Sequence, residues 1–294
     1  MVPTVTFTKA EALAHGVSEY DWRVLVRERG VRRVVAGVYA DAATPDTMQL
    51  RLSAVARVLP EGVVLARRSA AWVLGVDALD PRGYPATPPV EVVASDPRLR
   101  PRRGLVQSHS AEDLRPDDVI TIDGVRLTTP LRTASDLGRF VPRPQALAAI
   151  DAFLHAGLIT LDRLTDESAR WRRRRGVRQL EAMVKIADPL CESPGESRMR
   201  LRAIDAGFPR PECQIPVHDL TGRVKYRLDL GYRDRRIGLE YDGEEFHGPD
   251  RAGADAERRE WIRRRGWRLA VFGRDAIYGP SRDFEDTLSR LWSG

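Results

Sequence analysis

The chain has 294 residues, of which 42% are hydrophobic and 31% charged, and its formal net charge is +6. This length suits two or three ordinary domains, and the hydrophobic fraction excludes a disordered chain. The positive charge favours an anionic partner, nucleic acid before membrane, although an arginine-rich composition with only three lysines can also reflect a GC-rich genome. No apolar stretch approaches the roughly 18 residues of a membrane helix, and no signal-peptide pattern opens the chain, so we expect a cytoplasmic protein.

The first 45 residues are predicted to form two helices followed by a β-hairpin. Thr8 and Glu11 have capping-box spacing, so a helix is expected from Thr8 to about His15, with Gly16 as its stop. A second helix is expected from Ser18 until Gly30, and residues 31–40 are rich in β-forming side chains. This order is typical of a winged helix-turn-helix, whose second helix enters the DNA major groove.

Five arginines of this segment are the predicted DNA contacts, because guanidinium groups bind phosphates and guanine edges. The alternative is that they only solvate a small helical hairpin. The five are Arg23, Arg27, Arg29, Arg32 and Arg33.

Residues 46–190 are predicted to form a mixed α/β segment without a catalytic signature. The patterns indicate helices over 47–59, 69–74, 142–156 and 161–169, and strands over 63–66, 90–94 and 104–108. Four consecutive arginines at 172–175 are either a solvated run or a nucleic-acid contact. The two cysteines, Cys191 and Cys213, lack CxxC or zinc spacing, so we expect them to be reduced.

A second hairpin is predicted from the period-two alternation of residues 226–232 and 237–243. A turn centred on Asp234 and Arg235 sets a register in which Leu230 faces Leu239 and Gly231 faces Gly238. This register makes one face apolar throughout, including Leu228, Tyr232, Ile237 and Tyr241. On the other face it places Asp229 opposite Glu240, with Arg227 opposite Asp242.

Two facing carboxylates predict a shared divalent cation. Like charges at cross-strand positions are destabilising, and Mg²⁺ (or Mn²⁺) is commonly held by one or two carboxylates with waters and phosphate. The predicted metal ligands are therefore Asp229 and Glu240, and Gly231 with Gly238 leaves room for an approaching backbone. The alternatives are a protonated carboxyl pair, or an arginine such as Arg227 that compensates both charges.

A third carboxylate, Glu196, opens a helix expected from Ser193 to Ala206. Its position is that of a capping-box glutamate, which is the simpler explanation. The same position also suits a carboxylate that points from the helix start towards the hairpin.

From Glu196 onward, about 100 residues resemble the very-short-patch-repair endonucleases of the PD-(D/E)XK nuclease superfamily. The features that match, in order, are Glu196, Asp229, Glu240-Tyr241-Asp242-Gly243, Phe246-His247, a charged helix from Asp255, and a strand over 266–272. The resemblance implies that Asp229 is the principal metal ligand, that His247 is the catalytic histidine, and that Glu196 assists.

The same resemblance places Glu240 at the acidic position of the E-x-K motif, with Asp242 where lysine is usual. The very-short-patch group also lacks that lysine and uses histidine. Its structural zinc is not expected here, because Glu244 stands where a cysteine ligand would be. The charged helix would supply phosphate contacts through Arg258, Arg259 and Arg263.

The first 140 or so residues are similar to AbiEi-type antitoxins, on the strength of Gly37-Val38-Tyr39 and Ser69-Ala70-Ala71-Trp72. These proteins are winged helix-turn-helix repressors of abortive-infection toxin–antitoxin pairs. The resemblance implies double-stranded DNA and a cognate toxin as partners.

We therefore expect an α/β (α+β) protein in three parts: a winged helix-turn-helix (1–45), a middle α/β domain (46–190) and a nuclease-like domain (191–294). The last would have a central mixed sheet flanked by helices. The expected function is Mg²⁺-dependent DNA cleavage or nicking. The alternatives are an antitoxin or regulator whose nuclease-like domain only holds DNA, and an enzyme that acts on RNA.

Overall fold

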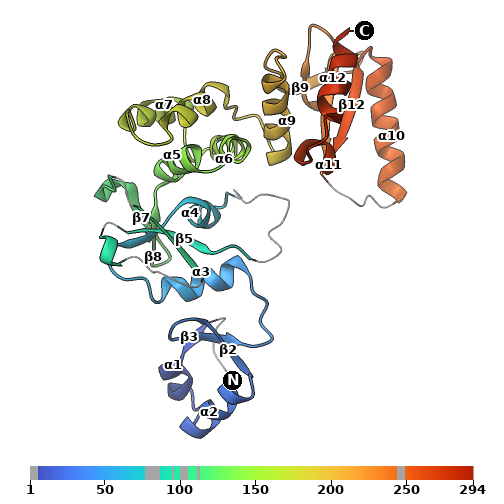
Figure 1. Ribbon diagram of the computed structural model, residues 1–294. Helices are drawn as coiled ribbons and strands as arrows, with labels where there is room; N and C mark the ends of the chain where they lie inside the picture. Colours follow the sequence, from blue (N-terminus) through green and yellow to red (C-terminus); the bar gives the residue numbers. More distant parts are fainter. Residues whose placement is uncertain are drawn as a thin grey trace. The chain divides into compact units, whose positions relative to one another are not determined.

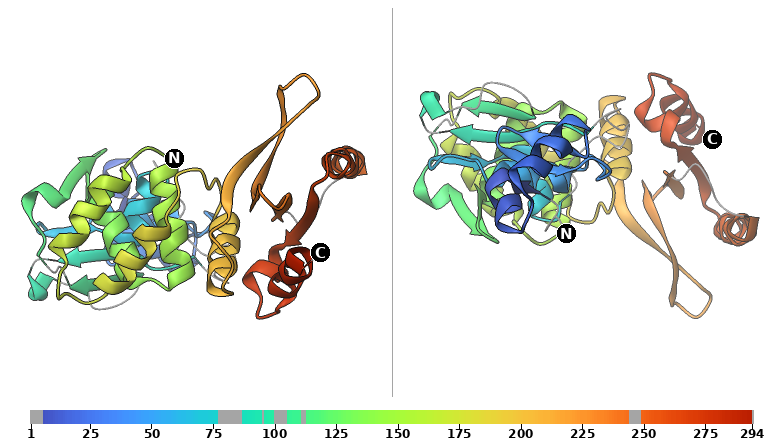
Figure 2. Two further views of the ribbon diagram at one scale, coloured as in Figure 1. Left: turned by 90° about the horizontal axis from the view of Figure 1, so that it is seen from above. Right: turned by 90° about the horizontal axis from the view of Figure 1, so that it is seen from below.

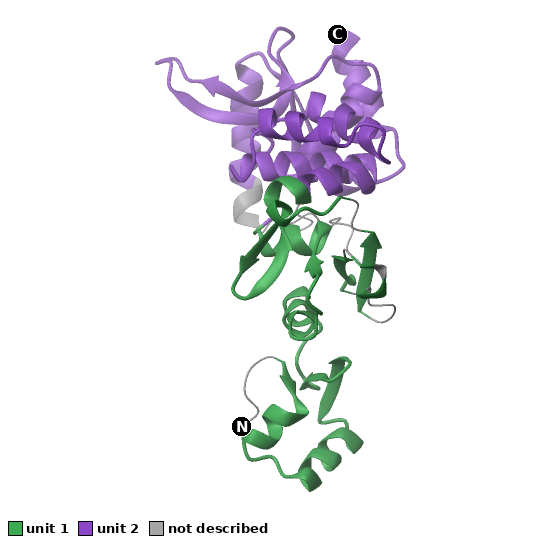
Figure 3. Ribbon diagram, turned by 90° about the vertical axis from the view of Figure 1, so that its left-hand side faces the viewer, with its two compact units in different colours: residues 1–75, 83–133 green, residues 76–82, 134–294 purple. Residues whose placement is uncertain are grey.

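A computed structural model describes residues 6–76, 87–94, 96–99, 105–110, 113–243 and 249–293. The protein is mixed α/β, as predicted, and its described residues form three sheets (Figure 1). It divides into two compact units, residues 1–75 with 83–133 and residues 76–82 with 134–294 (Figure 3). The division into three domains stays a prediction. Within the described ranges, no helix is both long and apolar enough to cross a membrane.

The N-terminal helices and hairpin form where they were predicted. Thr8 makes the expected capping box with Glu11, and Ser18 caps the second helix. The sheet has the order β1-β3-β2, and Trp22 packs edge-on against Tyr39 with ring centroids 4.9 Å apart. The elements are β1 (Phe7–Thr8), α1 (Lys9–Ala14), α2 (Glu19–Arg27), β2 (Val31–Val35) and β3 (Val38–Asp41).

The rest of the first unit is built around a five-stranded sheet of order β6-β5-β4-β8-β7. The hairpin β7–β8 was not predicted, although Asp123-Gly124 is a strong hairpin signal and both residues have positive φ. The elements are α3 (Met48–Ala56), β4 (Val63–Leu65), α4 (Arg67–Val73), β5 (Val90–Ala94), η1 (Pro97–Leu99), β6 (Val106–Ser110), η2 (Pro116–Asp118), β7 (Val119–Ile122) and β8 (Val125–Thr128).

A run of helices precedes the third sheet. A buried ion pair, Asp151 with Arg200, joins α6 to α9, and the Asp151 carboxylate also accepts a 2.7 Å hydrogen bond from the Ser197 hydroxyl. An exposed pair, Arg143 with Asp205, joins the same two helices at 3.0 Å. The helices are α5 (Pro130–Phe140), α6 (Arg143–His155), α7 (Leu161–Arg170), α8 (Val177–Ile186) and α9 (Pro194–Asp205).

The third sheet has the order β12-β11-β10-β9, in which β9, β10 and β11 are antiparallel and β12 runs parallel to β11. Helices α9, α11 and α12 pack on one apolar cluster of the sheet and α10 packs on the other (Figure 2). Helix α10 begins at Pro249, six residues before the predicted start at Asp255. The elements are β9 (Glu212–His218), β10 (Val224–Tyr232), β11 (Ile237–Asp242), α10 (Pro249–Arg264), β12 (Arg268–Gly273), α11 (Arg274–Tyr278) and α12 (Asp283–Ser293).

The two ion pairs between α6 and α9 differ in burial and therefore in their expected effect on stability. Asp151→Ala leaves the buried Arg200 guanidinium uncompensated, so the free energy of unfolding of the second unit should fall by about 3–5 kcal/mol. Urea denaturation followed by circular dichroism measures this loss.

The matched control is Asp205→Ala, which removes the exposed pair and should cost less than about 1 kcal/mol. Equal losses in the two variants would contradict the assigned role of the buried pair.

Candidate functional site

The hairpin of β10 and β11 has the predicted register over its inner residues. Leu230 pairs with Leu239, Gly231 with Gly238, and Tyr232 with Ile237, around the four-residue turn 233–236. The two glycines do not leave a gap, because a Cβ on Gly231 would lie 2.3 Å from the Ile237 carbonyl oxygen. A Cβ on Gly238 would meet the Leu228 and Leu269 side chains. The expected room for a substrate backbone is therefore already filled by the chain itself.

The expectation that one face of the hairpin is apolar throughout is wrong, because Leu228 and Leu230 lie on opposite faces. Leu230 packs with the cluster under α9, whereas Leu228 packs with the cluster under α10. Their partners on β9, Cys213 and Ile215, divide in the same way. The backbone of Gln214, between them, has φ of 51°, in the left-handed region. This conformation rotates the strand, so the period-two alternation fails at this point.

Asp229 lies between Leu228 and Leu230, just beyond the last paired residues of β10 and β11, and its carboxylate joins the two strands at this point. Its Oδ2 accepts a 2.8 Å hydrogen bond from the backbone N–H of Tyr241. Asp229 and Glu240 line the same hollow of about 180 Å³. Burial raises the pKa of each carboxyl, and for Glu240 the charge of Asp229 adds to the rise. The structure thus brings the two predicted metal ligands together.

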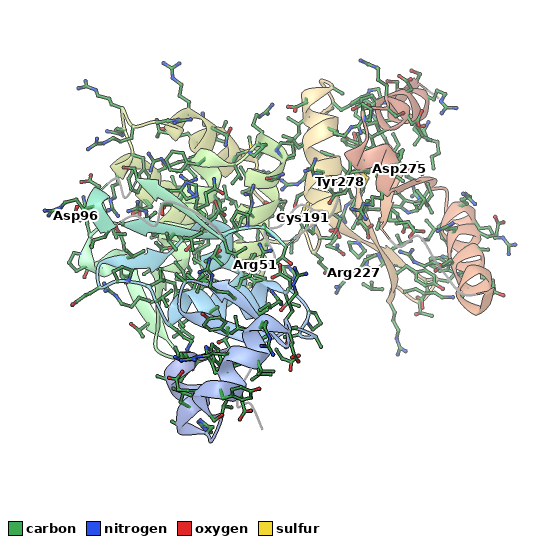
Figure 4. All side chains as sticks on the ribbon, turned by 60° about the horizontal axis from the view of Figure 1, so that its bottom comes forward. Arg51, Asp96, Cys191, Arg227, Asp275 and Tyr278 are labelled. Atoms are coloured by element: carbon green, nitrogen blue, oxygen red, sulfur yellow. The ribbon has the colours of Figure 1, made fainter. Side chains whose placement is uncertain are left out.

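An arginine compensates the carboxylates, but it is Arg258 of α10. Arg258 Nη1 donates a 3.0 Å hydrogen bond to Glu240 Oε2, and Nη2 forms an ion pair with Oε1 at 2.7 Å, although Oε1 accepts no hydrogen bond from a described residue. The same guanidinium donates to the Arg227 carbonyl at 2.8 Å. The Arg227 side chain, which the sequence suggested for this task, is exposed and belongs to β10 (Figure 4).

Glu196 is buried at the first turn of α9 with a strongly shifted titration. Burial raises its pKa to about 7, and the charge of Asp229 adds to the rise. Its Oε2 accepts hydrogen bonds from the Glu192 backbone N–H at 3.0 Å and from Gln214 Nε2 at 3.3 Å. This is not the standard capping box, because the acceptor reaches the residue before the N-cap Ser193.

Helix α9 approaches the hairpin closely at its first turn. A Cβ on Gly195 would lie 2.2 Å from Cε1 of Tyr241, so only glycine fits at this position. This contact places Glu196 next to the strands that carry Asp229 and Glu240. The sequence suggested this orientation for Glu196 but could not separate it from a simple helix cap.

The remaining predicted site residues are distributed unevenly. Asp242 faces the hollow and forms a 3.5 Å ion pair with Arg259. Two of the three predicted phosphate-binding arginines of α10, Arg258 and Arg259, are therefore engaged with acids, while Arg263 is exposed. His247, with Phe246 and Glu244, lies outside the described residues.

The donor set fits a divalent cation only in part. Asp229 and Glu240 offer carboxylate oxygens to one hollow, which matches the one or two carboxylates that commonly hold Mg²⁺. Among the described residues, no three His, Cys, Asp or Glu side chains form a metal-binding group. A cation would also have to share Glu240 with Arg258, so waters and a substrate phosphate would supply the remaining ligands.

Gln214 is the residue of this site that sequence reasoning missed. Its side-chain amide donates to Glu196. On β9 it lies between Cys213 and Ile215, whose partners on β10, Leu230 and Leu228, flank Asp229. Nothing in the one-dimensional pattern distinguishes this glutamine, because its role comes from the left-handed backbone and from strand pairing.

The predicted DNA-binding arginines of the first unit present a mixed surface. Arg23, Arg27, Arg29 and Arg33 are exposed, while Arg32 is half-buried and donates to the Thr44 carbonyl at 2.9 Å. The first turn of α2 is acidic, with Glu19 and Asp21. The positive side chains therefore gather towards the end of α2 and the start of β2.

Comparison with known proteins finds a matching family model and two similar proteins. Residues 61–186 match the family model of the AbiEi antitoxin C-terminal domain. The chain is similar to two uncharacterized proteins of Mycobacterium tuberculosis, from strains CDC 1551 / Oshkosh and ATCC 25618 / H37Rv. Each is 32% identical over 247 residues, which cover 84% of this chain and 86% of the relative.

The raised pKa of Glu196 predicts a pH-dependent stability. The folded chain keeps a proton that the unfolded chain releases above its ordinary pKa of 4.5, so stability should fall as the pH rises from about 4.5 to about 7. In Glu196→Gln this loss is absent, and relative to the wild type the variant should gain up to about 3 kcal/mol between pH 4.5 and 8. Urea denaturation of both proteins across this range measures the gain.

Glu285→Gln is the matched control with the opposite sign. Although burial raises the pKa of Glu285, the hydrogen bonds and charge of Arg202 outweigh it, and the pKa is lowered overall. This variant should lose stability relative to the wild type as the pH rises through the acid range. A stability difference for Glu196→Gln that stays constant with pH would show that Glu196 titrates normally.

Proposed function

The chain belongs to the same family as the two Mycobacterium tuberculosis proteins, and from this premise we propose that it is a DNA-binding protein of the AbiEi antitoxin type with a metal-dependent DNA-cleaving site in its C-terminal domain. The AbiEi match supports a role in DNA binding or in a toxin–antitoxin pair. DNA binding is assigned to the two helices and hairpin of residues 7–41, as a winged helix-turn-helix. A cognate toxin is the proposed protein partner.

One observation carries the proposed cleavage activity: Asp229 and Glu240 line one hollow, and the charge of Asp229 acts on the buried Glu196. Glu196 comes from α9, Asp229 from β10 and Glu240 from β11, and burial raises the pKa of each. Burying acids together costs stability, and perturbed carboxyls in a hollow are a mark of functional sites. Parallel pairing of β12 with β11 after an antiparallel meander supports a PD-(D/E)XK type of core.

In this proposal, two of the acidic residues bind the metal and the third lies beside them. Asp229 and Glu240 would hold Mg²⁺, which when bound neutralises charge on the scissile phosphate and lowers the pKa of a coordinated water. Asp229 is oriented by the Tyr241 N–H, and Glu196 is held by Glu192 and Gln214 beside it. His247 is the proposed general base, from the resemblance to very-short-patch-repair endonucleases.

A second candidate is a regulator whose nuclease-like domain binds DNA without cleaving it. The ion pair between Arg258 and Glu240 favours this function, because it neutralises a proposed metal ligand without a metal. In the cleaving protein, a DNA phosphate would have to draw Arg258 away from Glu240.

Conversion of supercoiled plasmid into nicked circles tests the cleavage proposal. The wild-type protein with Mg²⁺ or Mn²⁺ should nick the plasmid, and Asp229→Asn should reduce the rate by about 100-fold or more because a metal ligand is lost. Asp234→Asn, in the exposed turn of the same hairpin, is the matched control and should keep the wild-type rate. If wild type and Asp229→Asn both bind DNA and leave the plasmid intact, the regulator is the correct assignment.

The salt dependence of DNA affinity tests the role of the N-terminal arginines. Each lost phosphate contact should lower the slope of log K against log salt by about 0.9. The variant Arg23→Ala/Arg27→Ala/Arg33→Ala should therefore show a smaller slope in fluorescence anisotropy with a duplex. Arg126→Ala, an exposed arginine of β8, should leave the slope unchanged. Unchanged slopes in both variants would place DNA binding elsewhere.

A further inference from the structure

The fold brings the two cysteines of the chain together, although 22 residues separate them in the sequence. Their Sγ atoms lie 3.3 Å apart, and both side chains are buried, with 2% of Cys191 and 7% of Cys213 exposed. Cys191 belongs to the segment that leads into α9 (Figure 4), and Cys213 lies on β9. Both thiols are free.

The surroundings of the two sulfur atoms suit a disulfide better than a metal. A disulfide needs a separation of about 2.0 Å, so the atoms have to close by only about 1.3 Å. A structural zinc takes four ligands at about 2.3 Å each. Within the part of the chain that the structure describes, no third histidine, cysteine or acid completes such a set around the pair.

The surroundings of the pair include one cation and one anion. The hydrogen bond with Cys191 and burial raise the pKa of Cys213, whereas the positive charge of Arg200 opposes this rise and favours the thiolate that reacts. The negative charge of Asp188 adds to the rise. The backbone around Cys191 is fixed, because Asp188 N–H donates to Asp151 at 2.8 Å and Arg210 donates to the Ala187 carbonyl at 3.0 Å.

We propose that Cys191 and Cys213 are a reversible oxidation site that forms an intramolecular disulfide with a peroxide as oxidant. One thiolate attacks the peroxide O–O bond, which gives a sulfenic acid and, with hydrogen peroxide, one water. The second thiol then attacks that sulfur, the S–S bond forms and a second water leaves. Two thiols are oxidised and one hydrogen peroxide is reduced to two waters. A dithiol reductant reverses the reaction by exchange.

The disulfide would act directly on the surroundings of Glu196. Glu192, which follows Cys191, donates its N–H to Glu196, and Gln214, which follows Cys213, donates its side-chain amide to the same oxygen. A bond between the cysteines ties these two donors together and closes a loop that contains α9. Oxidation should therefore hold Glu196 in place; its effect on DNA cleavage rests on the proposed function of the site.

Thiol chemistry of the purified full chain tests the oxidation site without DNA or metal. After treatment with hydrogen peroxide, the denatured protein should show no free thiols in place of two, and its mass should fall by about 2 Da. Mapping of peptides should find Cys191 linked to Cys213 within one chain. The melting midpoint should rise by roughly 5–10 °C and return after reduction.

Cys191→Ala and Cys213→Ala are the controls, and each should lose the melting shift while keeping the wild-type circular dichroism spectrum. If these variants fail to fold, peptide mapping of the wild type still decides the question. Two free thiols after treatment, links between separate chains, or sulfinic acids in place of a disulfide would each overturn the proposal. A positive result with no plasmid nicking would leave the oxidation site standing and reject only the proposed nuclease.

Discussion

The second unit depends on one buried ion pair, Asp151 with Arg200, because this pair joins the helices of the AbiEi-type segment to the helix that carries Glu196. Two unpaired charges in this interior would be costly, so the pair fixes the position of α9 relative to α6. Arg200 also donates to the Ile186 carbonyl, and Asp151 accepts from the Asp188 N–H. By fixing α9, the pair also sets the positions of Cys191 and Glu196 near the start of that helix.

In the acidic site, unlike at the Asp151–Arg200 pair, the acids are not matched one to one by bases among the described residues. Asp229 and Glu240 line one hollow, and the start of α9 brings Glu196 near enough for the charge of Asp229 to act on it. The base that pairs with Glu240 is Arg258. Because burial disfavours the charged form of these carboxyls, a bound proton or a cation stabilises them. The same Arg258 explains how the site remains stable without a metal, and a DNA phosphate offers it an alternative partner.

Several features could be read from local sequence. Capping at Thr8, Ser18 and Ser193 located three helices. The period-two alternation and the turn at 233–236 located the hairpin of β10 and β11 and the pairing of Leu230 with Leu239. These signals survive because they depend on neighbours within a few residues. The hairpin β7–β8 was not predicted, although its Asp-Gly turn is a strong local hairpin signal.

The sequence by itself determined which acids occupy the hairpin and the helix start, and that a cation, a shared proton or an arginine had to offset their charge. Only the tertiary structure decided that Arg258 does so, that Leu228 leaves the expected face, and that Gln214 contacts Glu196. It also brought Cys191 and Cys213 together. Each of these contacts joins elements far apart in the chain, and spacing along a sequence carries no information about which distant elements pack together.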